Sequence, residues 1–185
     1  TLLTIWNQGV IMAAKTGTYT LIASTAGTGS SGTVSFTSIN SAYTDLVLVI
    51  NANGSYNGFG VYMTLNGDTT SKYSVTTVKG NSGGATSSRN TSQTNMLIGG
   101  WSIGAGSTYN SPIIMHINDY ANTSTYKTVL TRANIFDNTP NSEVSATVGL
   151  YQSTSAISRI DLITGAGNWN TTASFKLYGI EAGNL

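Results

Sequence analysis

The segment from Ile113 to Arg132 contains two runs separated by a polar corner, and in each run two sets of side chains alternate residue by residue. Before the corner, one set is Ile113, Met115 and Ile117, and the other is Ile114, His116 and Asn118. After it, one set is Tyr126, Thr128, Leu130 and Arg132, and the other is Lys127, Val129 and Thr131. A period of two is typical of a β-strand with two different faces. The corner holds Asp119, Asn122, Thr123 and Ser124, whose side chains can bond their own backbone and end a strand. The segment therefore predicts a strand, a corner and a second strand.

Short segments of the same kind recur along the chain, so that about ten strands are expected in all. Besides the two at the corner, they are Thr18–Ala23, Thr33–Phe36, Tyr43–Ile50, Val61–Leu65, Tyr73–Lys79, Met96–Trp101, Val144–Tyr151, Ile157–Ile163 and Ser174–Ile180. Strand starts are roughly 10 to 15 residues apart, which indicates an antiparallel sandwich or barrel. No window of about 11 residues has the apolar spacing of a helix. The sequence predicts an all-β domain.

Three segments carry more specific predictions. The run Tyr43–Ile50 contains five consecutive aliphatic residues, which favours a central strand buried on both faces. Asn66-Gly67 predicts a tight turn, because both residue types tolerate a positive φ. The longest polar stretch, Gly80–Thr94, predicts either a mobile surface loop or a segment that becomes ordered against a partner.

Charged residues are scarce, which excludes several classes of partner. They make up 8% of the 185 residues and the net charge is +1, whereas about 25% is average for a globular domain. The eight Lys and Arg residues are scattered, so no nucleic-acid partner is expected. No apolar run approaches the roughly 20 residues that span a bilayer, and no membrane partner is expected. Cysteine is absent, which excludes disulfides and Cys-based zinc sites.

A chain of this length can form one domain with a sizeable core, and no repeat or linker divides residues 18–185. Residues 1–17 are assigned to an N-terminal arm or an upstream extension. Within them, Thr1–Ile11 contains no charge, and Met12 opens a segment that resembles a natural start. Codons for Asn7–Val10 can contain a ribosome-binding sequence just before the Met12 codon. Residues 1–11 are therefore either translated upstream sequence or a genuine arm.

The residues that could carry catalysis form no recognisable site. His116 is the single histidine, and it falls on the face opposite Met115, toward solvent or a subunit contact. No serine stands in a G-x-S-x-G elbow. Most acidic residues stand in polar corners where Asp makes turns, and Asp161 alternates with Ile160 and Leu162 and should point out of the core. The turn at Asp68 offers one acid, without the D-x-D-x-D spacing of a calcium loop. We expect no enzyme, no bound metal and no cofactor.

Several aromatic residues lie beside Asn and Thr, a combination that suits carbohydrate. The candidate glycan contacts are Tyr56, Trp101, Tyr109 and Trp169. The alternative is that about half of these aromatic residues belong to the core at strand ends.

Six segments in order resemble a family of jelly-roll virion proteins of tailed bacteriophages, of the head-decoration or tail-fibre type. They are YTLIAS (19–24), SINSAYTDLVLVINANGS (38–55), VYMTLNGDTTSKYS (61–74), INDYANTSTYKTVLTR (117–132), VGLYQSTSAISRIDL (148–162) and FKLYGIEA (175–182). The resemblance runs from about Thr18 to the C-terminus. It supplies no catalytic motif, and residues 1–11 fall outside it.

The resemblance implies an antiparallel two-sheet β-sandwich of jelly-roll type over residues 18–185. It also implies a structural protein located in the virion, which decorates or cements the capsid or forms part of a fibre. The expected partners are copies of the chain itself, with a trimer favoured, and other virion proteins. The alternative is a carbohydrate-binding receptor-recognition module at the tip of a tail fibre, with a host surface glycan as its ligand.

Overall fold

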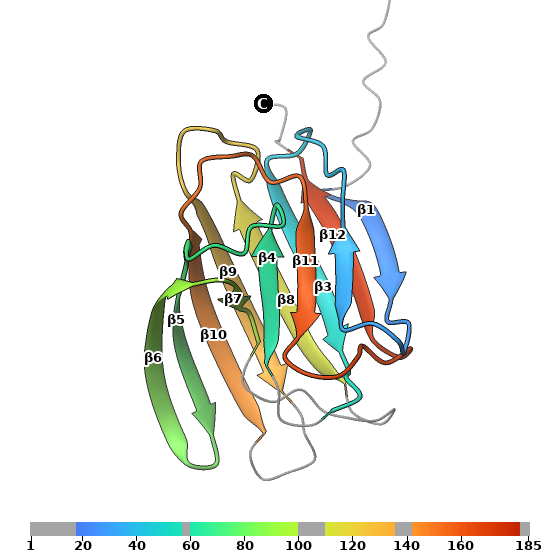
Figure 1. The fold of residues 1–185 in the computed structure, drawn as a ribbon, viewed down its shortest axis with the longest axis vertical. Coiled ribbons are helices and arrows are strands. Elements are labelled where there is room, and N and C mark those ends of the chain that lie inside the picture. Colours follow the sequence, from blue (N-terminus) through green and yellow to red (C-terminus); the bar gives the residue numbers. More distant parts are fainter. Residues whose placement is uncertain (1–17, 57–59, 100–109, 136–141, 182–185) are drawn as a thin grey trace, which may run out of the picture.

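The computed structural model describes residues 18–56, 60–99, 110–135 and 142–181, which form twelve strands and no helix (Figure 1). The strands are β1 Tyr19–Ala26, β2 Thr33–Phe36, β3 Asp45–Ala52, β4 Val61–Leu65, β5 Tyr73–Asn81, β6 Gly84–Gln93, β7 Met96–Leu97, β8 Ser111–Asn118, β9 Lys127–Ile135, β10 Glu143–Tyr151, β11 Ile160–Thr164 and β12 Ser174–Ile180. Eight form a large sheet, in the order β1-β12-β3-β8-β9-β10-β5-β6, and four form a small sheet, in the order β2-β11-β4-β7. The sheets stack face to face, and all pairings are antiparallel, so the predicted antiparallel β-sandwich is confirmed.

The strand pairings are nested. β1 pairs with β12, β2 with β11, β3 with β8 and β4 with β7, so successive strands from the N-terminal side meet strands from the C-terminal side in reverse order. The first strands alternate between the sheets, since β1 and β3 join the large sheet and β2 and β4 the small one. The other four strands, β5, β6, β9 and β10, extend the large sheet on one side (Figure 1).

The strand, corner and strand predicted around Asp119 are present as β8 and β9, which pair with each other. Asp119 turns the chain with a φ of 48°. The Asn122 carboxamide oxygen then accepts hydrogen bonds from the backbone N–H groups of Ser124 (2.6 Å) and Thr125 (3.0 Å). Burial alternates strictly along β9, with Lys127 on the buried face and Leu130 on the exposed face. The polar side chains thus end one strand and start the next.

Two predictions about individual strands are wrong. β3 was expected to be buried on both faces, but its second face is only partly covered: Val47 is 3% exposed and Val49 is 40% exposed, while Leu48 and Ile50 on the first face are fully buried. The strand is internal to the large sheet, between β12 and β8, yet only one of its faces meets the small sheet. The segment Gly80–Thr94 was expected to be either a mobile surface loop or a segment that becomes ordered against a partner, but it forms the end of β5 and the whole of β6. Both faces of β6 are polar and exposed, so no hydrophobic alternation marked it as a strand.

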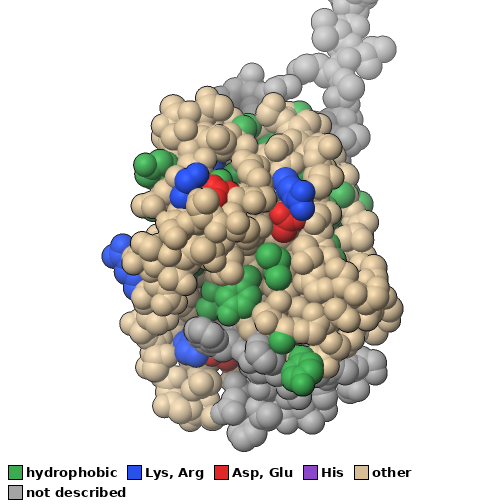
Figure 2. Space-filling view, in the orientation of Figure 1, with side chains coloured by type: hydrophobic (Ala, Val, Ile, Leu, Met, Phe, Trp, Pro, Cys, Tyr) green, Lys and Arg blue, Asp and Glu red, His purple; other side chains and the backbone are tan. Residues whose placement is uncertain are grey.

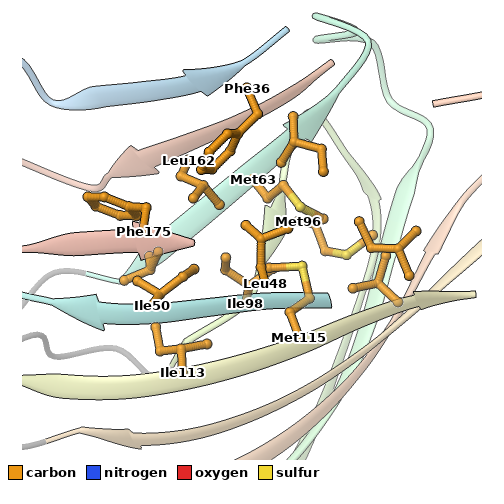
Figure 3. Packing of buried hydrophobic residues seen from close by; sticks show 14 of the residues in the cluster. Phe36, Leu48, Ile50, Met63, Met96, Ile98, Ile113, Met115, Leu162 and Phe175 are labelled. Carbon is orange, nitrogen blue, oxygen red and sulfur yellow. The ribbon is translucent and has the colours of Figure 1, made fainter. Parts of the chain in front are cut away.

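The core lies between the sheets (Figure 3). Leu48, Ile50, Ile113, Met115 and Phe175 of the large sheet face Phe36, Met63 and Leu162 of the small sheet, with Met96 and Ile98 packed among them. Gly149 lets β10 approach this cluster, because a Cβ on this residue would lie 2.2 Å from the Met96 sulfur. The core therefore fixes which face of the large sheet is covered.

Candidate interaction surface

Acidic groups in the described part of the chain serve structure. No three His, Cys, Asp or Glu side chains within residues 18–56, 60–99, 110–135 and 142–181 gather as a metal site. Asp161 projects from the outer side of the small sheet, away from the core as expected, but it is only 4% exposed. Burial opposes its ionisation, but hydrogen bonds from Arg159 Nε (2.9 Å) and Ser35 Oγ (2.5 Å) outweigh this and lower its pKa. Its neighbours on β2 and β4 cover it.

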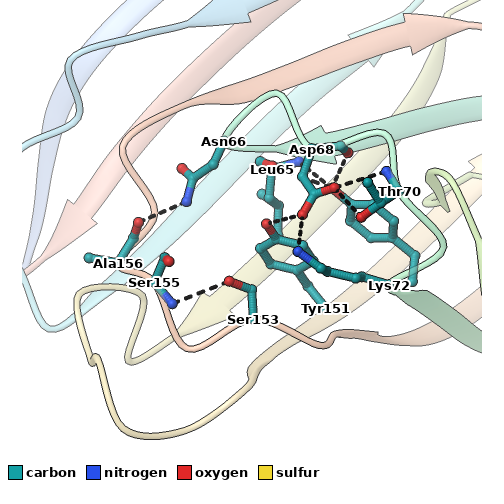
Figure 4. A network of polar contacts seen from close by, with 10 residues as sticks. Leu65, Asn66, Asp68, Thr70, Lys72, Tyr151, Ser153, Ser155 and Ala156 are labelled. Atoms are coloured by element: carbon teal, nitrogen blue, oxygen red, sulfur yellow. Dashed lines mark hydrogen bonds and ion pairs between the residues drawn. The ribbon is translucent and has the colours of Figure 1, made fainter.

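Asp68 is the centre of a second polar network, in the turn after β4 (Figure 4). Asn66 and Gly67 both have positive φ, 55° and 67°, as the tight turn required. The Asp68 carboxylate accepts hydrogen bonds from Thr70 Oγ1 (2.5 Å) and Thr70 N (2.9 Å), and from Lys72 Nζ and Tyr151 Oη, each at 2.9 Å. These donors, Thr70 first and Lys72 next, hold the pKa of Asp68 far below its usual range. The carboxylate ties the turn to the end of β10.

The four candidate glycan contacts do not form one site in the described structure. Trp169 is fully buried, its ring packs edge-on against Phe175, and its Nε1 donates to the Leu162 carbonyl oxygen at 3.2 Å. The Trp169 ring is therefore a core residue with no surface to offer a sugar. Tyr56 is 61% exposed. Trp101 and Tyr109 lie outside the described residues.

A different surface stands out on the large sheet. We call the side that points away from the small sheet its outer face. Residues directly opposite each other on neighbouring strands share a face, so the pairings define rows across the sheet. The first row is Leu21, Tyr178, Val47, His116, Leu130, Val148, Thr76 and Arg89. The second row is Lys176, Val49, Ile114, Arg132, Ala146, Val78 and Ser87. His116 therefore lies within this face, in agreement with the alternation.

Exposed hydrophobic side chains are concentrated on the outer face. Of the ten large hydrophobic residues that are exposed in the described part of the chain, eight project from it. They are Tyr19, Leu21, Val49, Val78, Ile114, Leu130, Val144 and Val148. None of the ten belongs to the four strands of the small sheet. The side of the molecule that carries the small sheet is largely covered by uncharged polar side chains and backbone (Figure 2).

The charged side chains in the first and second rows of the outer face are all positive. They are Lys176 in β12, Arg132 in β9 and Arg89 in β6, and the half-buried His116 lies among them. One end of the face is hollowed into a shallow depression of about 470 Å³, which Val78, Val144 and Ala146 help to line. Monomeric proteins seldom expose a continuous apolar area of more than a few hundred Å². The outer face therefore has the composition of a contact surface.

Sequence reasoning missed this surface, although its signal is present. Val144 and Val148 alternate with Ser145 and Thr147, and both sets belong to the same strand. Hydrophobic side chains on the less buried set of a strand are the sign of a second contact face. The period of two gave the two faces of each strand, but it did not show that the less buried faces join into one surface.

A scan against protein-family models finds no match, and no curated protein matches the chain. In the residues that the structure describes, there is no helix with the length and apolar character needed to cross a membrane.

Proposed function

We propose that this protein is a non-enzymatic structural component of a tailed-phage virion and that the outer face of its large sheet is its contact with the particle. The observation that carries the proposal is the concentration of exposed hydrophobic side chains on that one face. Leu130 and Val148 lie directly opposite each other on β9 and β10, and Ile114 on β8 is the diagonal neighbour of Leu130, so the three side chains gather across three adjacent strands. A surface of this kind is stabilised when a second protein surface removes it from water. The resemblance of the six segments to virion proteins of tailed phages supports a phage particle as the place where this contact is made.

We also propose that the sandwich is a jelly roll with a four-stranded extension. The nested pairing supports this assignment, because eight strands remain when β5, β6, β9 and β10 are set aside. These eight form two four-stranded sheets, β1-β12-β3-β8 and β2-β11-β4-β7, as expected when one long hairpin is rolled into two Greek keys. The extension enlarges the outer face, since Leu130, Val144 and Val148 all belong to β9 or β10.

The low charge of the chain is suited to dense assembly. A net charge of +1 gives little repulsion between copies held close together on a particle. The proposed partners are copies of this chain and other virion proteins, at the capsid surface or in a fibre. No residue is assigned to catalysis.

A paired substitution on the outer face tests the proposal. Leu130 and Val148 are direct neighbours on β9 and β10, 45% and 51% exposed. Leu130→Asp with Val148→Asp should leave the fold intact but prevent incorporation, because carboxylates would be buried without partners in the contact. The matched control is Thr33→Asp, at an exposed position on the small sheet. Incorporation is measured in virions whose genome carries this coding sequence, by immunogold electron microscopy and by quantitative blotting of purified particles.

The expected result is loss of label for the paired variant and normal label for wild type and for Thr33→Asp. Normal incorporation of a folded paired variant would show that the outer face is not the contact. Absence of the wild-type chain from purified particles would refute the virion role itself. Glycan-array binding by the wild-type chain that is lost in Tyr56→Ala would instead favour the carbohydrate-binding alternative.

A further inference from the structure

Strand β6 leaves one side of its backbone open. It is the last strand of the large sheet, and β5 is the single described strand that pairs with it. In an antiparallel pair, the backbone groups of successive residues point alternately toward and away from the neighbouring strand. About half of the ten residues of β6 therefore direct their N–H and C=O groups away from β5. All ten side chains are exposed.

The features that usually protect such an edge are largely missing from β6. Proteins block open edges with proline, with charged side chains, with bulges or with short strands. Residues Gly84–Gln93 contain no proline and one charged residue, Arg89. Pairing with β5 is regular from Gly84 to Asn90, and the register shift lies beyond this segment, opposite Tyr73 and Val75.

The other edges are different. β1, at the opposite end of the large sheet, has its register broken in the middle, between Leu21 and Ala23. The edge strands of the small sheet, β2 and β7, have four and two residues. Among the described edges, β6 alone offers a long and regular stretch of backbone.

We propose that β6 pairs antiparallel with β6 of a second copy of this chain, about a two-fold axis at Ser87. An antiparallel pair of identical strands is self-complementary, since each copy supplies the donors and acceptors that the other lacks. Ser87 is the middle residue of the regular segment Gly84–Asn90, so this register pairs the whole segment.

Charge favours the same register. With Ser87 on the axis, Arg89 of one copy lies opposite Ala85 of the other. The two arginines are then four residues apart along the pair, which is about 14 Å at about 3.4 Å per residue. A register centred on Arg89 would instead place the two guanidinium groups together, which opposes pairing. The other residues near the axis, Thr86 and Ser88, are small and uncharged.

The pairing has two consequences for the assembly. The two large sheets become one continuous sheet, and their outer faces lie on the same side of it. The number of copies is even, a dimer or an assembly of dimers, whereas the sequence resemblance favoured a trimer. The inference does not depend on the location of the protein in a virion, so it can fail or hold independently of the proposed function.

Cysteine cross-linking on the full chain tests the register, because the natural sequence contains no cysteine. Ser87→Cys should give a covalent dimer on mild oxidation or with a short bis-maleimide reagent. The control is Thr76→Cys, an exposed position on the same face one strand further in. Two Thr76 residues would be separated by three strand spacings across the sheet, about 14 Å, and by about 14 Å along the strands because Thr76 pairs with Arg89, so they should not form a disulfide. Ser87→Cys that cross-links no better than Thr76→Cys would overturn the proposal.

Light scattering and proline substitution test the pairing itself. The wild-type chain of 19.3 kDa is expected to have the mass of an even number of copies. Of Thr86→Pro and Ser87→Pro, one removes an N–H that points away from β5, and that variant should stay folded by circular dichroism and become monomeric. A strictly monomeric or trimeric wild-type chain would refute the pairing. The pairing would also be refuted if Thr86→Pro and Ser87→Pro both fold and both keep the wild-type mass. If both proline variants unfold, the cross-linking result decides.

Discussion

At the residue scale, Trp169 shows how the surroundings decide the role of an aromatic side chain. In the sequence it stands in a segment rich in Gly, Asn and Thr, which suited a sugar contact. In the structure its ring lies in the core against Phe175, and the Trp169 nitrogen is satisfied by the Leu162 carbonyl. Trp169 therefore belongs to the core.

Trp169→Ala is expected to lower the free energy of unfolding by about 3–5 kcal/mol, because it leaves a large cavity in the core. Tyr56→Ala, which removes a mostly exposed ring, should change the same quantity by no more than about 0.5 kcal/mol. Denaturant unfolding followed by circular dichroism gives both values. Equal stability of Trp169→Ala and wild type would show that the ring does not support the core.

Asp68 should make the stability of the fold depend on pH at acidic values. The folded-state pKa of Asp68 lies below the unfolded value of about 3.9. The stabilisation it provides is therefore complete above about pH 4 and is lost as the pH falls through the folded-state pKa. In Asp68→Asn the carboxylate is gone, and with it this part of the pH dependence.

The difference in melting temperature between wild type and Asp68→Asn should be largest between about pH 5 and about pH 7 and should shrink below about pH 4. At neutral pH the variant should lose about 1–3 kcal/mol, because several donors lose a charged acceptor. A difference that stays constant down to about pH 2 would show that the charge of Asp68 does not matter.

At the scale of elements, β3 illustrates how two faces of one strand differ. Leu48 faces the small sheet and is fully buried, whereas its neighbour Val49 is 40% exposed on the outer face. The same carboxylate placed at these adjacent positions meets two environments. Comparing an Asp at position 48 with an Asp at position 49 therefore separates the effect of burying a charge from the effect of placing a charge in a strand.

Leu48→Asp should prevent soluble expression, because an unpaired charge in an apolar core costs far more than the fold can supply. Val49→Asp, the matched control, should fold with a loss of no more than about 1 kcal/mol, within the range of β-propensity. Soluble yield and melting temperature are the measurements. A folded Leu48→Asp variant with an unchanged melting temperature would contradict the central position of β3.

At the scale of the whole molecule, stability comes from packing far more than from charge. The described residues contain three ion pairs, Lys72–Asp68, Lys79–Glu143 and Arg159–Asp161. The cationic partner is 45% exposed in the first and 49% exposed in the third. Surface pairs of this kind contribute about 0–1 kcal/mol each.

At neutral pH, the free energy of unfolding should change by less than about 1 kcal/mol between about 0.05 M and about 0.5 M NaCl. Chloride is preferable to sulfate for this test, because sulfate strengthens hydrophobic burial by itself. Denaturation with urea, which is uncharged, measures the effect. A loss of several kcal/mol in high salt would reveal an electrostatic contribution that the ion pairs do not explain.

The sequence by itself determined much of the local structure. Alternation with a period of two identified β8 and β9, and the short β-rich segments Thr33–Phe36 and Ser174–Ile180 match β2 and β12 residue for residue. Asn66-Gly67 and the corner at Asp119 were readable because their backbone preferences are properties of the residues themselves. The alternation of side chains and the conformational preferences of turn residues are local properties, so they can be predicted without knowledge of the fold.

The tertiary structure alone decided which strands pair and what covers each face. Backbone hydrogen bonds are chemically the same in every strand, so the sequence of β6 does not indicate that it is the edge strand of the large sheet. Burial depends on a second layer that comes from distant parts of the chain. For this reason Val49 is exposed, Trp169 is buried, and Lys127 is covered while its ammonium group donates to the carbonyl oxygens of Thr125 (2.8 Å) and Thr154 (3.2 Å). The outer face exists because eight strands join edge to edge and a four-stranded sheet covers only their other side.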